Sequence, residues 1–136
     1  LIVVRIDIQC EITPVPFKDI SKAAPGEPSA NIRERVIKAR EIQAARYKDY
    51  KGIHCNAQMT ERMIHQFAEP NEAGIDMLRM AMEKLSLSAR AYSRILKVAR
   101  TIADLEGCEH VELHHLAEAI GYRALDRGDW AERGHI

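Results

Sequence analysis

The fold is decided by residues 85–107, which read LSLSARAYSRILKVARTIADLEG. Apolar residues recur there at spacings of three and four, and this period is typical of a helix with one buried face. Ser88 stands where an N-cap is expected, and Gly107 is a good C-terminal stop. The side chains that this helix is predicted to bury are Ile95, Val98, Ile102 and Leu105. The rest of the chain must supply the surface against which this face packs.

Four more helices are predicted around this one. They cover residues 29–48, residues 60–68, a segment that begins at Pro70, and residues 114–125. Proline suits a helix start because its missing N–H would have no partner there. The expected N-caps of the first two are Ser29 and Thr60. The side chains of these helices that should face the core are Ile32, Val36, Ala39, Gln43, Met63, Ile64, Phe67, Ile75, Leu78, Met82, Leu85, Leu116, Ala119, Ile120 and Tyr122.

The beginning of the chain follows a different pattern. Residues 2–12 alternate between two faces with apolar side chains on one of them, which predicts a half-buried β-strand. Pro14 and Pro16 end it because proline cannot donate to a strand ladder, and residues 17–28 are predicted to form a loop. Nothing later in the sequence repeats the alternation, so the strand lacks a partner. The expected fold is mainly α, a small helical bundle of about five helices with an N-terminal β-strand.

Composition restricts the class of protein. The 136 residues are 46% apolar, which allows one compact core and not two. Twenty Lys and Arg balance twenty Asp and Glu, so no global charge favours nucleic acid or an anionic membrane. No apolar run approaches the roughly 20 residues of a membrane span, and we expect neither a membrane partner nor a secretory signal. Three widely spaced cysteines favour a reducing compartment, so a cytoplasmic protein is expected.

Positive charge gathers in two places. Residues 29–51 hold seven Lys and Arg against three acids. Two interpretations stay open: a solvated face with ion pairs such as Glu34 with Lys38, or a surface that contacts a phosphate backbone. The candidate nucleic-acid contacts are Arg33, Arg40 and Lys48. A second row, which shares one face of the helix after Ser88 and can meet a polyphosphate, consists of Arg90, Arg94 and Lys97.

Cysteine and histidine residues offer a possible metal site. Cys108, His110 and His114 have a spacing that can bring two or three ligands together. A structural zinc site takes four ligands, and one further cluster of these residue types lies at residues 54–55. We therefore predict no metal site. His115 is expected to pack or cap at the start of the last helix.

Four stretches, taken in order, resemble one known family. Residues 85–105 resemble the sensor II helix of the magnesium-chelatase-like AAA+ ATPases, and within that family the ComM competence-protein branch. Residues 5–8 (RIDI) resemble the segment that carries an arginine before the last core strand. Residues 26–36 (GEPSANIRERV) resemble the first lid helix, and residues 111–123 (VELHHLAEAIGYR) resemble the closing helix. The resemblance extends over nearly the whole chain.

The resemblance implies a domain organisation and a set of site residues. Residues 1–28 would be the last core strand and linker, residues 29–127 a helical C-terminal lid domain, and residues 128–136 a disordered tail. In this family the lid closes over ATP with a sensor II arginine, which corresponds to Arg90. The other site residues implied are Arg94 as a second nucleotide ligand and Arg5 as an arginine finger acting in the neighbouring subunit. Arginine fingers accelerate phosphoryl transfer by about 10³–10⁵ because they stabilise charge on the transferring group.

The chain also departs from the family. It contains neither a G-x-x-x-x-G-K-[ST] loop nor an apolar strand ending in paired acids, so the chain alone should not hydrolyse ATP. ATP, and Mg²⁺ with it, would be bound mainly by a core domain outside this sequence. Val4 stands where the family usually has an acid.

The partners implied are an N-terminal AAA+ core of the same protein, neighbouring subunits of a homo-oligomeric ring, and DNA. The implied function is to couple ATP binding and hydrolysis to DNA remodelling or branch migration. The alternative is a freestanding helical nucleic-acid-binding module that uses the basic residues 29–51.

Overall fold

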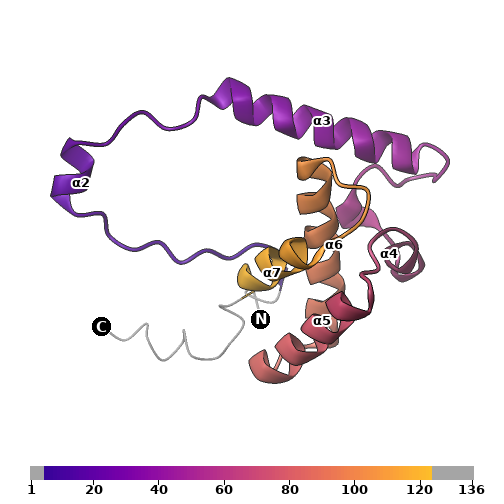
Figure 1. The fold of residues 1–136 in the computed structure, drawn as a ribbon. Coiled ribbons are helices and arrows are strands. Elements are labelled where there is room, and N and C mark those ends of the chain that lie inside the picture. The colour runs from indigo at the N-terminus through magenta and orange to yellow at the C-terminus, as the bar shows by residue number, and fades with distance from the viewer. Residues whose placement is uncertain (1–4, 124–136) are drawn as a thin grey trace.

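The computed structural model describes residues 5–123, in which the regular structure is entirely helical (Figure 1). The elements are α2 (Phe17–Ser21), α3 (Ser29–Tyr47), the 3₁₀ helix η1 (Asn56–Gln58), α4 (Glu61–Phe67), α5 (Glu72–Leu85), α6 (Ala89–Glu106) and α7 (Leu113–Gly121). The prediction of a mainly helical bundle is confirmed. None of the helices in the described part of the chain has the length and apolar character that a membrane span requires.

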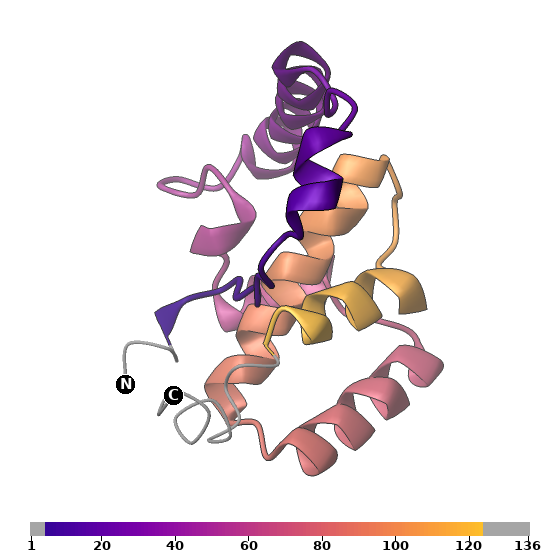
Figure 2. The same cartoon turned by 90° about the vertical axis from the view of Figure 1, so that its left-hand side faces the viewer.

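The central helix of the bundle is α6. Helices α3, α4 and α7 and the η1 turn pack against it, and α5 packs on α7 (Figures 1 and 2). Most of its predicted inner face is correct, since Ile95 and Val98 are buried and Ile102 is half-buried, but Leu105 is exposed. Burying one such aliphatic side chain fully stabilises the fold by roughly 1.5–3 kcal/mol. Residues 85–107 therefore supply the surface on which the other helices assemble.

Hydrogen-bonded caps set several helix boundaries. Ser88 Oγ accepts the N–H of Ala91 at 3.3 Å, and Thr60 Oγ1 accepts the N–H of Met63 at 3.3 Å. Gly107 follows α6 with a φ of 77°, a left-handed conformation that glycine adopts without a steric penalty. These three predicted boundaries are confirmed.

Two other predicted helix starts are shifted by one or two residues. Ser29 is the first helical residue of α3, and Pro28 occupies the N-cap position. Asn71 caps α5 by accepting the N–H of Gly74 at 2.9 Å, so the helix begins after Pro70 and not at it. A Cβ on Gly74 would lie 2.5 Å from the Cβ of Pro70 and 2.8 Å from a leucine side chain of α7. Glycine at this position lets α5 approach α7 closely.

The predicted N-terminal β-strand is wrong for the residues that the structure describes. Residues 5–16 contain no strand, and residues 1–4 lie outside the described part. A strand is stable only when a neighbouring strand accepts and donates its ladder bonds, and residues 5–123 offer none. The Gln9 N–H bonds instead to the carbonyl of Tyr122 at 2.9 Å. The alternating apolar side chains consequently stay in solvent, with Ile12 88% exposed.

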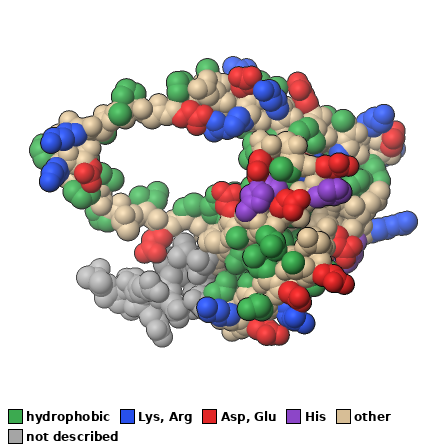
Figure 3. Space-filling model, viewed as in Figure 1, with side chains coloured by type: hydrophobic (Ala, Val, Ile, Leu, Met, Phe, Trp, Pro, Cys, Tyr) green, Lys and Arg blue, Asp and Glu red, His purple; other side chains and the backbone are tan. Residues whose placement is uncertain are grey.

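The predicted loop at residues 17–28 contains one helical turn, α2. The carbonyl of Pro16 accepts the N–H of Asp19 at 2.9 Å, which starts the turn. None of its residues is buried, and Phe17 is 82% exposed. Figure 3 shows the arch formed by residues 10–28 standing away from the bundle with open space inside it. The sequence did not reveal α2 because a five-residue helix has no amphipathic period.

Burial along α3 differs between its two halves. The first buried residue is Ala39, followed by Gln43 and Tyr47. Ile32 and Val36, predicted to face the core, are exposed, because the first half of α3 extends beyond the bundle toward the arch (Figure 1). Ile75 of α5 is likewise exposed against prediction. The last helix ends at Gly121, and the predicted residues 124–125 and 128–136 lie outside the described residues.

A buried carboxylate joins α3 to α6. The two oxygens of Asp104 accept from Arg46 Nη2 at 2.6 Å and Nη1 at 2.8 Å, and Oδ1 also accepts from Arg100 Nε at 3.1 Å. Asn56 Nδ2 donates to Asp104 Oδ2 at 2.8 Å and its Oδ1 accepts from Tyr47 at 2.6 Å. The hydrogen bonds that Arg46 donates to Asp104 raise the pKa of Arg46, whereas burial lowers the pKa of Arg100. These bonds hold the second half of α3 against the C-terminal half of α6.

Candidate functional site

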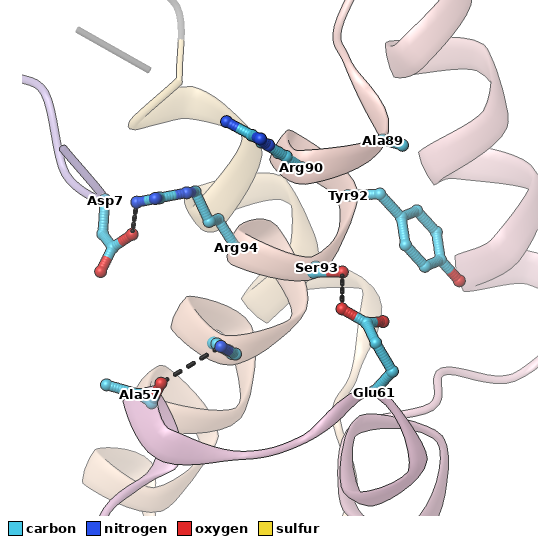
Figure 4. Close-up of a pocket in the computed structure, with 9 residues that line it drawn as sticks. Asp7, Ala57, Glu61, Ala89, Arg90, Tyr92, Ser93 and Arg94 are labelled. Carbon is cyan, nitrogen blue, oxygen red and sulfur yellow. Dashed lines mark hydrogen bonds and ion pairs between the residues drawn. The ribbon is translucent and has the colours of Figure 1, made fainter. Parts of the chain in front are cut away.

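A hollow of about 670 Å³ lies beside the N-terminal half of α6 (Figure 4). Its walls come from α6, from the start of α4, from η1 and from the segment before the arch. The lining residues are Asp7, Ala57, Glu61, Ala89, Arg90, Tyr92, Ser93, Arg94 and Lys97. Three cations therefore face two carboxylates. The predicted cationic row on α6 is brought together here.

Arg90 is the second residue of α6, two positions after its Ser88 cap and within the first turn. Its side chain is exposed and forms no hydrogen bond or ion pair with any residue in the described range 5–123. Figure 4 shows the side chains of Arg90 and Arg94 extending to the same side of α6. The positive end of the helix dipole adds to the attraction for an anion at this position. Arg90 can therefore offer its planar fork of donors to a phosphate group.

Arg94 is held by the segment that precedes the arch. Its Nη1 donates to the carbonyl of Arg5 at 2.7 Å and to Asp7 Oδ1 at 2.7 Å. The side chain of Arg94 is 28% exposed. Arg94 lies in the hollow beside Arg90. Unlike Arg90, it already has protein partners, and both of its bonds use the same nitrogen. Arg5 itself is exposed and is not among the residues that line the hollow.

The other charged groups of the hollow are also bonded to protein. Lys97 Nζ donates to the carbonyl of Ala57 at 3.1 Å, and Ser93 Oγ donates to Glu61 Oε1 at 2.8 Å. Among the charged residues lining the hollow, Arg90 alone has no bond to a described residue. Sequence reasoning found the three cations from their helical spacing but missed Glu61 and Asp7, which come from distant segments.

The candidate nucleic-acid contacts lie on or just after α3, away from this hollow. Arg33, Arg40 and Lys48 are all exposed, and none forms an ion pair with a residue in the described range. Other cations of α3 are paired: Lys38 with Glu34 at 3.3 Å, as predicted, and Arg35 and Arg46 with acids elsewhere. Some cations of α3 are thus neutralised by acids of the protein, and others are exposed to a possible phosphate ligand.

The histidines at the start of α7 form a hydrogen-bonded cluster with Glu106. The N–H of Glu112 donates to Nδ1 of the buried His115 at 2.9 Å, which confirms the predicted capping role. Nε2 of His115 lies 2.6 Å from Glu106 Oε2, and Nε2 of His114 lies 2.8 Å from it. Both hydrogen bonds lower the pKa of Glu106, and the bond with His114 has the larger effect.

Within residues 5–123, this cluster is the group of possible metal ligands whose ligand atoms lie near enough to one another to share an ion. Ligand atoms of Glu106, His114 and His115 lie within 4.8 Å of one another, whereas the spacing of Cys108 and His110 does not bring them into this group. Because Nδ1 of His115 accepts a backbone N–H, the neutral ring carries its proton on Nε2. That nitrogen donates to Glu106 and has no lone pair for a metal. The geometry therefore favours a hydrogen-bonded link between α6 and α7 over a metal site.

Comparison with known proteins covers most of the chain. Residues 26–123 match the family model described as magnesium chelatase, subunit ChlI C-terminal. The competence protein ComM of Haemophilus influenzae is 42% identical over 124 residues, which are 90% of this chain and 23% of that protein. Uncharacterized protein YifB of Escherichia coli and that of Salmonella typhimurium are each 40% identical over 90% of this chain and 24% of their own length. The chain spans about a quarter of the length of these curated relatives.

Proposed function

Because this chain belongs to the family of magnesium chelatase subunit ChlI C-terminal domains, we propose that it is the helical lid of an AAA+ ATPase. In this proposal Arg90 is the sensor II residue and binds the terminal phosphate of ATP held by a separate core. The relatives are about four times longer than the matched region, so they contain other domains beside the one matched here. A core with a P-loop would be one of them.

The observation that carries the proposal is the state of Arg90. It is an exposed guanidinium without a partner in the described residues, at the first turn of the central helix, in an open hollow with two further cations. An arginine that only stabilised the fold would have its donors satisfied by protein, as Arg100 does. A phosphate of a nucleotide bound next to the lid has the charge and shape that this site accepts.

The chemistry assigned to the lid is electrostatic. Arg90 would neutralise charge that develops on the transferring phosphoryl group, and Arg5 would do the same in the site of the neighbouring subunit. The core would bind most of the ATP and the accompanying Mg²⁺. Contact between Arg90 and the terminal phosphate would hold the lid closed, and loss of that phosphate would release it.

The larger process proposed is remodelling or branch migration of DNA by a homo-oligomeric ring. The name of the relative ComM, a competence protein, fits a role in handling incoming DNA. Rotation of the lid during each ATP cycle would be the movement transmitted to the DNA.

The test is Arg90→Ala in the ATPase that contains this domain. We expect ATP affinity to change by less than about threefold and turnover to fall by at least about tenfold, because the contact acts mainly on the transition state. Arg62→Ala is the control, since Arg62 is an exposed arginine of α4 that does not line the hollow. Equal turnover in the wild type and Arg90→Ala would remove Arg90 from the reaction.

A second function is favoured by three cations on or just after α3 that form no ion pair with a residue in the described range. Arg33, Arg40 and Lys48 could bind a phosphate backbone if the chain were a nucleic-acid-binding module by itself. Such a module would bind duplex DNA with an affinity that falls steeply with salt, and replacing the three residues by Ala would lower the salt slope by about three. The lid proposal predicts weak binding or none by the isolated chain at about 0.15 M salt.

A further inference from the structure

Residues 5–9 are bonded to the helical bundle, although their alternating pattern predicts a strand. At one end, Arg94 Nη1 donates to both the carbonyl of Arg5 and the carboxylate of Asp7, each at 2.7 Å. Figure 4 shows the Arg94 side chain reaching from α6 to Asp7. The segment that carries the candidate arginine finger is thus attached to the helix that carries the candidate sensor arginine.

Two further contacts fix the same segment. The guanidinium of Arg123 donates to the carbonyl of Ile6, and the N–H of Gln9 donates to the carbonyl of Tyr122 at 2.9 Å. Arg123 and Tyr122 both follow directly on α7. Residues 5–9 are therefore held between α6 and the end of α7, and the chain leaves the bundle where the arch begins (Figure 1).

From these contacts we infer that Arg94 is a positioning residue that couples Arg5 to Arg90. The inference rests on the proposed function, which assigns Arg90 to the nucleotide of its own subunit and Arg5 to that of the neighbour. Arg90 and Arg94 are one helical turn apart on α6, so a movement that brings Arg90 to a phosphate also moves Arg94. Through the Arg5 carbonyl and Asp7, it moves the backbone from which the Arg5 side chain extends. Arg94 thereby sets the position in which Arg5 is offered to the next subunit, and its two bonds to the segment remain when Arg90 is replaced.

This role differs from that of a second phosphate ligand, which the resemblance implied for Arg94. A phosphate ligand acts in its own subunit, in the same way as Arg90. A residue that positions Arg5 acts on the site of the neighbouring subunit. The two roles therefore predict opposite behaviour in mixed rings.

The experiment uses the full-length ATPase and mixtures of two variant subunits. Arg90→Ala subunits lack the residue that acts within a subunit but still offer Arg5, and Arg5→Ala subunits have the opposite defect. Mixing these two should restore turnover at sites formed between complementary neighbours. Arg94→Ala alone should lower turnover about tenfold, because a shift of about 1 Å in a catalytic group is enough for a loss of this size or larger.

The coupling role predicts that Arg94→Ala restores turnover when mixed with Arg90→Ala but not when mixed with Arg5→Ala. The reverse pattern would make Arg94 a ligand of its own subunit's nucleotide and overturn the inference alone. Restoration with neither partner would show a general structural defect and would also overturn it. If Arg90→Ala and Arg5→Ala fail to complement each other, the proposed roles of both arginines fail and the inference fails with them.

Two more variants guard against a subunit that does not fold. Asp7→Ala removes one of the two acceptors that the exposed segment offers to Arg94 and leaves α6 intact, so it should fall in the same complementation class as Arg94→Ala. If Arg94→Ala does not assemble, the class of Asp7→Ala decides. Arg94→Lys keeps a charge and a donor, and since one nitrogen of Arg94 makes both bonds, it should retain about half of the wild-type turnover or more.

Discussion

The two halves of α6 carry the same type of residue in opposite circumstances. Near its N-terminus Arg90 is exposed and has no partner among the described residues. Ten residues further, Arg100 is 2% exposed and donates to Asp104 and to the carbonyls of Phe67, Cys108 and Glu109. The comparison teaches that the number of satisfied donors, and not the residue type, separates an arginine that maintains the fold from one available to a ligand.

The energetic roles of the two ends should differ accordingly. A buried ion pair that loses one partner leaves an uncompensated charge inside the protein, which is strongly destabilising. An exposed arginine without partners can be removed with little effect on folding. The following changes test this contrast on the unfolding free energy of the chain.

The largest effect is expected from Asp104→Ala. The substitution leaves the guanidinium groups of Arg46 and Arg100 without their carboxylate, and removing one partner of a buried pair costs about 3–5 kcal/mol. Urea denaturation followed by circular dichroism measures it. Asp49→Ala is the control, because Asp49 is exposed and should change stability by less than about 0.5 kcal/mol. A loss for Asp104→Ala no larger than that of the control would contradict the role assigned to the network.

A smaller effect is expected from Ser88→Ala. It removes the side-chain acceptor for the N–H of Ala91 at the start of α6 and should cost about 1 kcal/mol, the typical value for an N-cap. Because Arg90 lies in this first turn, the variant should also reduce turnover in the full-length ATPase. Ser88→Asp, which keeps an acceptor, should restore stability; failure to do so would show that the cap is not the cause.

The link between α6 and α7 should show itself in pH dependence. Hydrogen bonds from His114 and His115 lower the pKa of Glu106 below 4.5, so the folded state favours the carboxylate. The stabilisation is complete above the pKa of the unfolded chain and is lost as the pH falls through the lower folded pKa. Between about pH 5 and pH 3, the unfolding free energy of the wild type should therefore fall more than that of Glu106→Gln. Parallel curves for the two proteins would contradict this link.

The smallest change in stability is expected from Arg90→Ala, within about 0.5 kcal/mol of the wild type. The result sharpens the comparison, because the same substitution should have a large effect on turnover. A loss of 2 kcal/mol or more, a size typical of a buried group left unsatisfied, would mean that Arg90 has partners essential to the fold.

Sequence patterns gave the helical architecture and the cationic row because both depend on local spacing. Ser88, Thr60 and Gly107 act through neighbours only a few residues away, so their roles could be predicted. Arg46 was indistinguishable from an exposed cation, because Asp104 reaches it only through tertiary packing. The spacing of Arg100 and Asp104 fits a pair within one helix, but the carbonyls that satisfy the other donors of Arg100 come from outside α6.

The alternating N-terminal segment was misread for a related reason. Alternation predicts a strand only if another strand is present to pair with it, and the described chain provides helices instead. The four hydrogen bonds that hold residues 5–9 join them to α6 and to residues after α7, about 90 to 115 positions away. No local pattern could have indicated them.

The central claim is that Arg90 contacts the terminal phosphate of ATP. Its most direct test is a structure of the full-length ATPase with a non-hydrolysable ATP analogue. We predict a guanidinium nitrogen of Arg90 about 2.7–3.0 Å from an oxygen of that phosphate, with Arg100 unchanged in its buried network. An Arg90 side chain that faces solvent while the lid is closed over the nucleotide would contradict the account.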